Sequence, residues 1–145
     1  MFCSMDSFSV HGIEAELIAV EVDVGNGMPG FDLVGYLAGE VREARERVQV
    51  ALRNSGYPLP ARRITVNLSP ADIRKGGTAY DLPIAIGILC GLEMIPGELT
   101  KGCGMIGELG LDGSVRSVPG VLSCVYEAKR LRFQSILVPM ENASE

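Results

Sequence analysis

The segment from Leu82 to Leu92, LPIAIGILCGL, constrains the fold more than any other part of the sequence. It is an unbroken run of 11 uncharged, apolar residues that ends at Glu93. A helix that is apolar on every side must be buried on most of its surface, so the run predicts a central core helix. Asp81 is placed to cap its N-terminus. Because roughly 20 residues are needed to cross a bilayer, we expect no membrane partner.

Strands are predicted from alternation and from turn signals. Residues 16–24, ELIAVEVDV, alternate charged and apolar side chains, and this period of two predicts a strand with one wet face. Residues 7–13 are expected to be its antiparallel partner, with a turn near His11-Gly12. The other predicted strands are 31–35, 62–68 and 135–139, and a hairpin over 104–118 is predicted to turn at Asp112-Gly113.

Two further helices are predicted from apolar residues at three- and four-residue spacing, over 38–54 and 119–131. In the second helix the residues expected to face inward are Val121, Leu122, Val125 and Ala128. Strands first, then helices mixed with strands, indicate an α+β fold: a mixed β-sheet with helices packed mainly on one side. The length of 145 residues suits a single domain over 1–145.

Charge is divided unevenly along the chain. The net charge of −5 argues against a uniformly basic nucleic-acid binder. Residues 42–75, however, hold eight basic and three acidic side chains, a net +5, and the other residues hold five basic and fifteen acidic ones, a net −10. Two interpretations stay open: a solvated helix with ion pairs, or a basic patch facing an acidic partner or a nucleic-acid strand. Seven of the eight basic residues are arginine, which favours bidentate recognition.

The sequence offers few residues for catalysis or metal binding. Residues 25–30 match G-x-G-x-x-G, but a strand-like segment follows where a dinucleotide site needs a helix, so we interpret the match as a turn. The chain has no G-x-x-x-x-G-K-[ST] motif, the phosphate-binding loop of ATPases. Its one histidine is His11, and its four cysteines form no CxxC pair. We therefore expect no catalytic, cofactor or metal site, and reduced thiols in a cytoplasmic protein.

Several ordered blocks carry a family resemblance that covers nearly the whole chain. They are NGMPGFDLVG (26–35), EVREARERVQVALRNSGYPLPARR (40–63), RRITVNLSPADIRKGGTAYDLPIAIGIL (62–89), GELGLDGSVRSVPGVL (107–122) and ILVPMEN (136–142). Together they resemble the N-terminal domain of the bacterial Mg-chelatase-subunit-I-like AAA+ proteins, the YifB/ComM family. The resemblance implies a ribosomal protein S5 domain 2-like fold, shared with the proteolytic domain of Lon.

The same resemblance implies a larger protein. In such family members this module precedes a Walker-type ATPase that assembles into rings, and some members are DNA branch-migration motors in natural transformation. We expect ATP and Mg only in that ATPase domain. The expected partners are the ATPase domain, neighbouring subunits of a ring and, through the larger protein, DNA.

Lon kinship implies a residue-level test for a Ser–Lys dyad. In Lon the catalytic serine lies in a Gly-rich loop before the core helix, and the matching residues here, 75–81, contain no serine. The Lon lysine begins the helix after the hairpin, where this chain has Gly120-Val121-Leu122-Ser123. We therefore expect a Lon-like fold without protease chemistry, because the site and not the fold decides function.

The leading hypothesis is a non-catalytic accessory domain that helps a ring ATPase assemble or engage its substrate. Two sets of contact residues are predicted. The first set lies in the loop 69–81 and consists of Asp72, Arg74, Lys75 and Asp81. The second set consists of arginines that could contact DNA, namely Arg42, Arg45, Arg62 and Arg63. Three alternatives remain: Asp72 and Asp81 only cap helices, the chain is a relic or rewired Lon-type peptidase, or it is purely an oligomerisation module.

Overall fold

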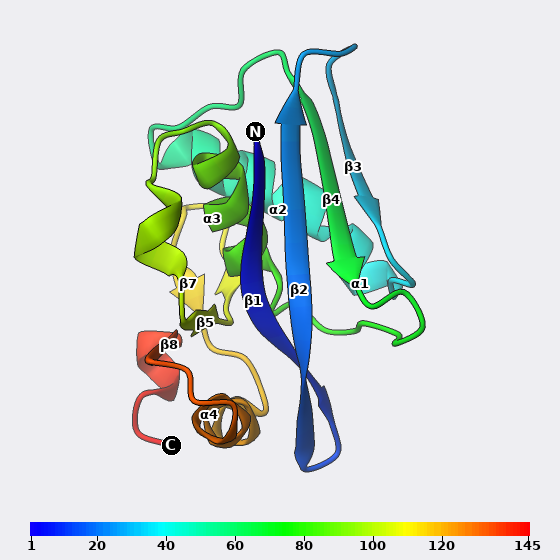
Figure 1. Ribbon diagram of the computed structural model, residues 1–145. Coiled ribbons are helices and arrows are strands. Elements are labelled where there is room, and N and C mark those ends of the chain that lie inside the picture. Colours follow the sequence, from blue (N-terminus) through cyan, green and yellow to red (C-terminus); the bar gives the residue numbers. More distant parts are fainter.

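Six strands form one mixed sheet in the computed structural model, which describes residues 1–145 (Figure 1). Its strand order is β3-β4-β2-β1-β5-β8. Neighbours pair antiparallel in β1–β2 and β2–β4 and parallel in β3–β4, β1–β5 and β5–β8. The strands are β1 (Phe2–His11), β2 (Glu14–Gly25), β3 (Gly30–Val34), β4 (Arg63–Ser69), β5 (Cys103–Met105) and β8 (Ser135–Leu137).

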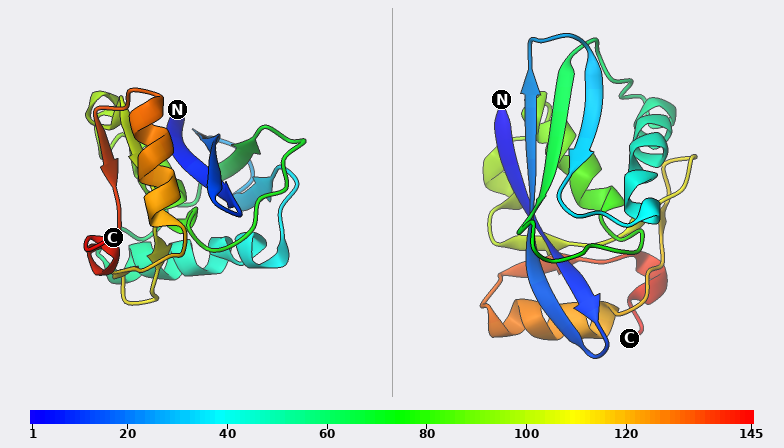
Figure 2. Two further views of the ribbon diagram at one scale, coloured as in Figure 1. Left: turned by 90° about the horizontal axis from the view of Figure 1, so that it is seen from below. Right: turned by 90° about the vertical axis from the view of Figure 1, so that its right-hand side faces the viewer.

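Four helices and a small ribbon complete the chain. The helices are α1 (Gly39–Arg42), α2 (Ala44–Asn54), α3 (Asp81–Gly91) and α4 (Val121–Arg130). A two-stranded ribbon joins β6 (Glu108–Leu109) to β7 (Val115–Arg116), and two 3-10 turns, η1 (Gly97–Thr100) and η2 (Met140–Asn142), lie in connecting segments. In Figure 1 α2 and α3 lie behind the sheet. Figure 2 shows α4 crossing the half of the β1–β2 hairpin that contains its turn.

The architecture confirms the predicted α+β class and most of the predicted elements. The strand predicted over 16–24 is the middle of β2, and its partner β1 turns at Gly12, which has a φ of +64°. The helix predicted over 38–54 is interrupted at Glu43 into α1 and α2. In the predicted hairpin over 104–118 only β6 and β7 pair with each other, because β5 joins the main sheet. No helix is long and apolar enough to span a membrane.

The main core lies between the sheet and the pair α2–α3. Alternate residues of β2 (Ile18, Val20, Val22 and Val24) are buried, and the matching residues of β4 continue the same apolar face. The opposite face is polar: Glu21 Oε1 accepts a hydrogen bond from Asn67 Nδ2 at 2.8 Å. The apolar residues that alternate along β2 therefore form the face of the sheet that α3 covers.

Helix α3 approaches β2 through two glycines spaced four residues apart. A Cβ added to Gly87 would lie 2.6 Å from Val22 Cγ2, and one added to Gly91 would lie 2.7 Å from Val24 Cγ2. Both distances are too short for real carbon atoms, so only glycine permits this contact. The glycines form the helix face that lies against the sheet.

A second, smaller core confirms two of the four inward-facing residues predicted for the helix over 119–131 and corrects the other two. It contains Val121, Cys124 and Ala128 of α4 packed with Phe8 of β1. Leu122, predicted to face inward, is 64% exposed, and Val125 is also exposed. Val121 and Ala128 are buried as predicted, and Cys124 completes the buried face in place of Leu122 and Val125.

The close α3–β2 contact makes a prediction at Gly87. Alanine usually stabilises a helix interior by about 0.5–1 kcal/mol relative to glycine, whereas forcing a methyl group into a filled core costs about 1–3 kcal/mol. We expect Gly87→Ala to lower the free energy of unfolding, measured in urea, by about 1–2 kcal/mol. Gly39→Ala is the matched control, because its Cβ would meet no atom within 4 Å. Equal unfolding free energies for the two variants would contradict the packing described.

Candidate functional site

The loop between β4 and α3, residues 70–80, is fastened to the segment that follows β3. The Lys75 amide donates to the Tyr36 carbonyl at 3.0 Å, and the Ala38 amide donates to the Lys75 carbonyl at 2.9 Å. Glu40 Oε1 accepts a hydrogen bond from the Gly77 amide at 3.0 Å. These bonds hold the loop across the N-terminus of α1.

Lys75 is turned inward, which corrects its predicted role as a contact residue. Its side chain is completely buried, and its Nζ donates to the Pro70 carbonyl within the same loop. Burial lowers the pKa of the Lys75 ammonium, and Asp72 partly opposes that effect. A buried side chain cannot contact an external partner, so Lys75 closes the loop instead. Asp72 and Arg74 remain exposed on the loop surface.

Asp81 is also buried, and it does not cap α3. The residue at the N-cap position is Tyr80, which makes no side-chain cap, and Asp81 belongs to the first helical turn. Its Oδ2 accepts from Arg47 Nε at 2.6 Å and from the Leu109 amide at 3.1 Å, and its Oδ1 accepts from Arg47 Nη2 at 3.0 Å. Asp81 therefore links α3 to α2 and β6, and neither predicted role, cap nor partner contact, is correct.

The pKa shifts of the Arg47–Asp81 pair follow from burial and from the hydrogen bonds within the pair. Burial raises the pKa of the Asp81 carboxyl, while the hydrogen bonds from Arg47 and Leu109 oppose the rise by stabilising the carboxylate. The hydrogen bond to Asp81 raises the pKa of Arg47. Arg47 Nη2 also donates to the Glu40 carbonyl at 2.8 Å, so the guanidinium is shared between the core pair and α1.

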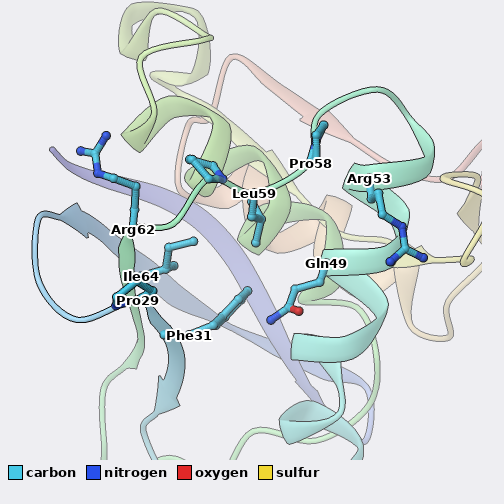
Figure 3. Close-up of a pocket in the computed structure, with 10 residues that line it drawn as sticks. Pro29, Phe31, Gln49, Arg53, Pro58, Leu59, Arg62 and Ile64 are labelled. Carbon is cyan, nitrogen blue, oxygen red and sulfur yellow. The ribbon is translucent and has the colours of Figure 1, made fainter.

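Two arginines border a cleft between α2, the β2–β3 connection and the proline-rich segment before β4. We call it the arginine cleft; it measures about 310 Å³ and its lining includes Pro29, Phe31, Gln49, Arg53, Pro58, Leu59, Arg62 and Ile64. Figure 3 shows Arg53 and Arg62 on opposite sides of the cleft, with Gln49 extending toward Phe31. Neither Arg53 nor Arg62 has a carboxylate within 4 Å among residues 1–145. The cleft therefore combines an apolar floor with unpaired positive charge.

The four arginines predicted to contact DNA are only partly brought together. Arg62 lines the cleft while its Nε donates to the Gly25 carbonyl at 3.2 Å. Arg45 lies one helical turn before Gln49, and its Nη1 donates to the Phe31 carbonyl at 3.3 Å. Arg63 instead pairs with Asp32 on the polar face of the sheet, and Arg42 is exposed at the end of α1.

Arg53 and Gln49 were not among the predicted site residues. They could have been found, because positions 45, 49 and 53 are four residues apart and lie on one face of a helix. The missing information was which helix face borders the cleft. The cleft forms because the segment that leads into β4 lies beside α2, and this tertiary contact cannot be derived from helical spacing.

The segments that correspond to the Lon serine, 75–81, and to the Lon lysine, 120–123, hold a lysine and a serine in structural contacts instead. Ser123 Oγ donates to the Ile13 carbonyl at 2.9 Å, and the Lys75 Nζ is engaged by Pro70. Ser9 Oγ lies 3.0 Å from His11 Nε2, but Ser9 is buried. No cluster of three or more His, Cys, Asp or Glu side chains that could hold a metal ion occurs in residues 1–145.

A second surface feature lies where the hairpin tip meets α4. Ile13, Leu122 and Tyr126 are exposed to 90%, 64% and 73%, and with Ala15 they line a cleft of about 730 Å³. We call this cluster the apolar patch. Its rim is charged, with Glu14, Glu127 and Arg130. An exposed apolar surface with a polar rim is typical of a protein–protein contact.

The amino-acid sequence is similar to that of a known protein family. Residues 20–142 match the family described as subunit ChlI of Mg-chelatase. The chain is 45% identical over 134 residues to the protein YifB of Salmonella typhimurium, and 42% identical over 134 residues to the competence protein ComM of Haemophilus influenzae. Each alignment covers 92% of this chain and 26% of the relative. The chain thus spans about a quarter of the length of these relatives.

A more distant similarity concerns the fold. Lon protease of Mycolicibacterium smegmatis is 23% identical over 141 residues, which cover 92% of this chain and 18% of Lon. The mixed sheet and its helices define an α+β module, and the weak similarity to Lon is consistent with the Lon-like, ribosomal protein S5 domain 2-like class. The chain belongs to the Mg-chelatase subunit ChlI family, together with YifB and ComM.

The buried Arg47–Asp81 pair makes a prediction about stability. Removing one partner of a buried ion pair leaves an uncompensated charge and costs about 3–5 kcal/mol, so we expect Arg47→Met to lower the free energy of unfolding in urea by about 3 kcal/mol. The Arg47→Met/Asp81→Leu double variant should lose less than the sum of the two single variants. Arg130→Met is the matched control: Arg130 pairs with Glu127 at the surface, where such pairs contribute about 1 kcal/mol or less. Equal losses in Arg47→Met and Arg130→Met would contradict the role assigned to the pair.

Proposed function

We propose that the chain is a non-catalytic accessory and assembly domain of a bacterial Mg-chelatase-like AAA+ ATPase. The observation that carries the proposal is the asymmetry of the alignments: 92% of this chain matches only 26% of YifB and ComM. What the chain shares with these relatives is one module of a larger protein. In this proposal ATP and Mg bind to the ATPase region, and the protein works in the cytoplasm.

The apolar patch supports an assembly role. Ile13 and Leu122 come from elements far apart in the sequence, yet both contribute to one exposed surface. We assign this patch to packing against the ATPase region of the same protein. The reason is that about three quarters of the relatives' length lies outside the shared module. Isolated ion pairs on the rim, such as Arg130–Glu127, would give such a contact its orientation.

The arginine cleft supports contact with DNA. Arg53 and Arg62 have no carboxylate within 4 Å, and Arg45 lies further along α2 with its Nη1 bonded to the Phe31 carbonyl. Arg45 Nε, however, pairs with Glu46 Oε1 at 3.3 Å, so the proposal rests on Arg53 and Arg62. Guanidinium groups match phosphate geometry through paired donors. We propose that the larger protein processes DNA as a branch-migration motor in competence, and the 42% identity to the competence protein ComM supports this role. In this proposal the arginine cleft holds the phosphate backbone of the DNA.

Salt-dependent DNA binding tests the proposed contact. The chain should bind a short fluorescent duplex in fluorescence anisotropy at low salt, with an affinity that falls as salt rises. Each lost phosphate contact lowers the slope of log K against log salt by about 0.9. We expect Arg53→Ala/Arg62→Ala to bind about tenfold more weakly, with a slope reduced by about 2.

A charge-matched variant separates a site from bulk charge. Lys129→Ala/Arg132→Ala removes two exposed cationic side chains at the end of α4, neither of which lines the cleft, and this variant should bind DNA like the unmodified chain. Equal losses in both double variants would mean that no specific site exists. Absence of binding by the unmodified chain at low salt would remove the DNA contact from the proposal.

A further inference from the structure

Two of the four cysteines are in direct contact although they are 87 positions apart in the sequence. Cys3 lies on β1 and Cys90 near the C-terminal end of α3, and their Sγ atoms are 2.9 Å apart. All four cysteines are free thiols, and both members of this pair are buried. The other two differ: the Cys103 thiol donates to the neighbouring Gly104 carbonyl, and Cys124 lies in the second core under α4.

Packing of α3 on the sheet fixes the two sulfur atoms. Cys3 pairs with Val22 in the β1–β2 register, and Val22 is the residue that α3 approaches through Gly87. One turn further along the helix, Gly91 lies against Val24 and close to the Met1 carbonyl. Because glycines bring the helix this close to the strands, the Cys90 thiol cannot move away from Cys3 without loosening the core.

A surface cleft gives small molecules access to the pair. It measures about 390 Å³ and is lined by the start of β1, by η1 and by the residues after it, and both Cys3 and Cys90 contribute to its wall. Cys3 retains a small exposed fraction, whereas Cys90 has none. The thiol that a reagent meets first is therefore Cys3, and Cys90 is the neighbour able to resolve the product.

We propose that Cys3 and Cys90 form a site of reversible disulfide modification by peroxides. The Cys3 sulfur attacks the peroxide oxygen and breaks the O–O bond, giving a sulfenic acid and, from hydrogen peroxide, one water. The Cys90 sulfur then attacks the sulfenic sulfur, which forms the S–S bond and releases the second water. Two thiols and one hydrogen peroxide thus give one disulfide and two waters, with two electrons passing from sulfur to the peroxide.

The environment sets the rate and the effect of this reaction. Burial, reinforced by the hydrogen bond with Cys90, raises the pKa of the Cys3 thiol to about 12. The thiolate is therefore scarce at neutral pH, and oxidation should be slow compared with that of an exposed cysteine. Once formed, the bond ties the N-terminal strand to the core helix and closes a long loop, which constrains the unfolded chain.

Mass spectrometry of the peroxide-treated chain tests the site. We expect the free thiols to fall from four to two, with the loss of two hydrogen atoms and a single Cys3–Cys90 cross-linked peptide. Dithiothreitol should restore all four thiols. The oxidised chain should melt about 5 °C or more above the reduced chain.

Two comparisons distinguish a built site from indiscriminate oxidation. Cys103→Ala/Cys124→Ala should still form the bond, whereas Cys90→Ala should leave Cys3 without an intrachain partner. In urea the preference for Cys3–Cys90 should disappear, because only the folded chain brings these thiols together. Four remaining thiols after prolonged peroxide treatment, or a cross-link that includes Cys103 or Cys124 in the folded chain, would overturn the proposal.

Discussion

The close contact of α3 with the β1–β2 hairpin is the constraint on which the other features depend. A helix that is apolar on all sides must be packed against other elements on all sides. Gly87 and Gly91 allow α3 to pack directly against the sheet, where they contact Val22 and Val24. The opposite side is covered by α2 and β6. The same approach places Cys90 against Cys3. Core packing and the cysteine site thus have one physical cause.

The packing around α3 explains why Lys75 and Asp81, two of the four contact residues predicted in the loop 69–81, are buried. Since the first turn of the helix is buried, Asp81 needs a cation inside the protein, and Arg47 of α2 supplies it through two hydrogen bonds. Lys75 is satisfied within its own loop. Charges that in sequence look available to a partner are therefore used to position α1, α2 and α3. Asp72 and Arg74 remain exposed, and the arginine cleft and the apolar patch are further exposed surfaces on a fold whose Lon relatives are proteases.

Local patterns predicted the fold well, and long-range contacts account for the errors. The alternation in β2 and the uninterrupted apolar run of α3 each describe one element, and both predictions are correct. The role of Asp81 depended on a residue 34 positions away, so the local preference for a capping carboxylate was misleading. In α4 the pattern fitted two neighbouring faces, and only contact with Phe8 selects the one with Cys124. Arg53 could have been found from its spacing to Arg45, but the cleft needed the tertiary structure.

In the proposed function this module contacts DNA through its surface arginines and not through the loop that corresponds to the Lon active site. Amide chemical-shift mapping by NMR, with a short DNA duplex titrated into the labelled chain, distinguishes these two surfaces. We expect shifts clustered along α2 and around Arg62, with residues 76–80 and the first turn of α3 unchanged. Shifts centred on residues 76–80, with α2 unaffected, would contradict this expectation.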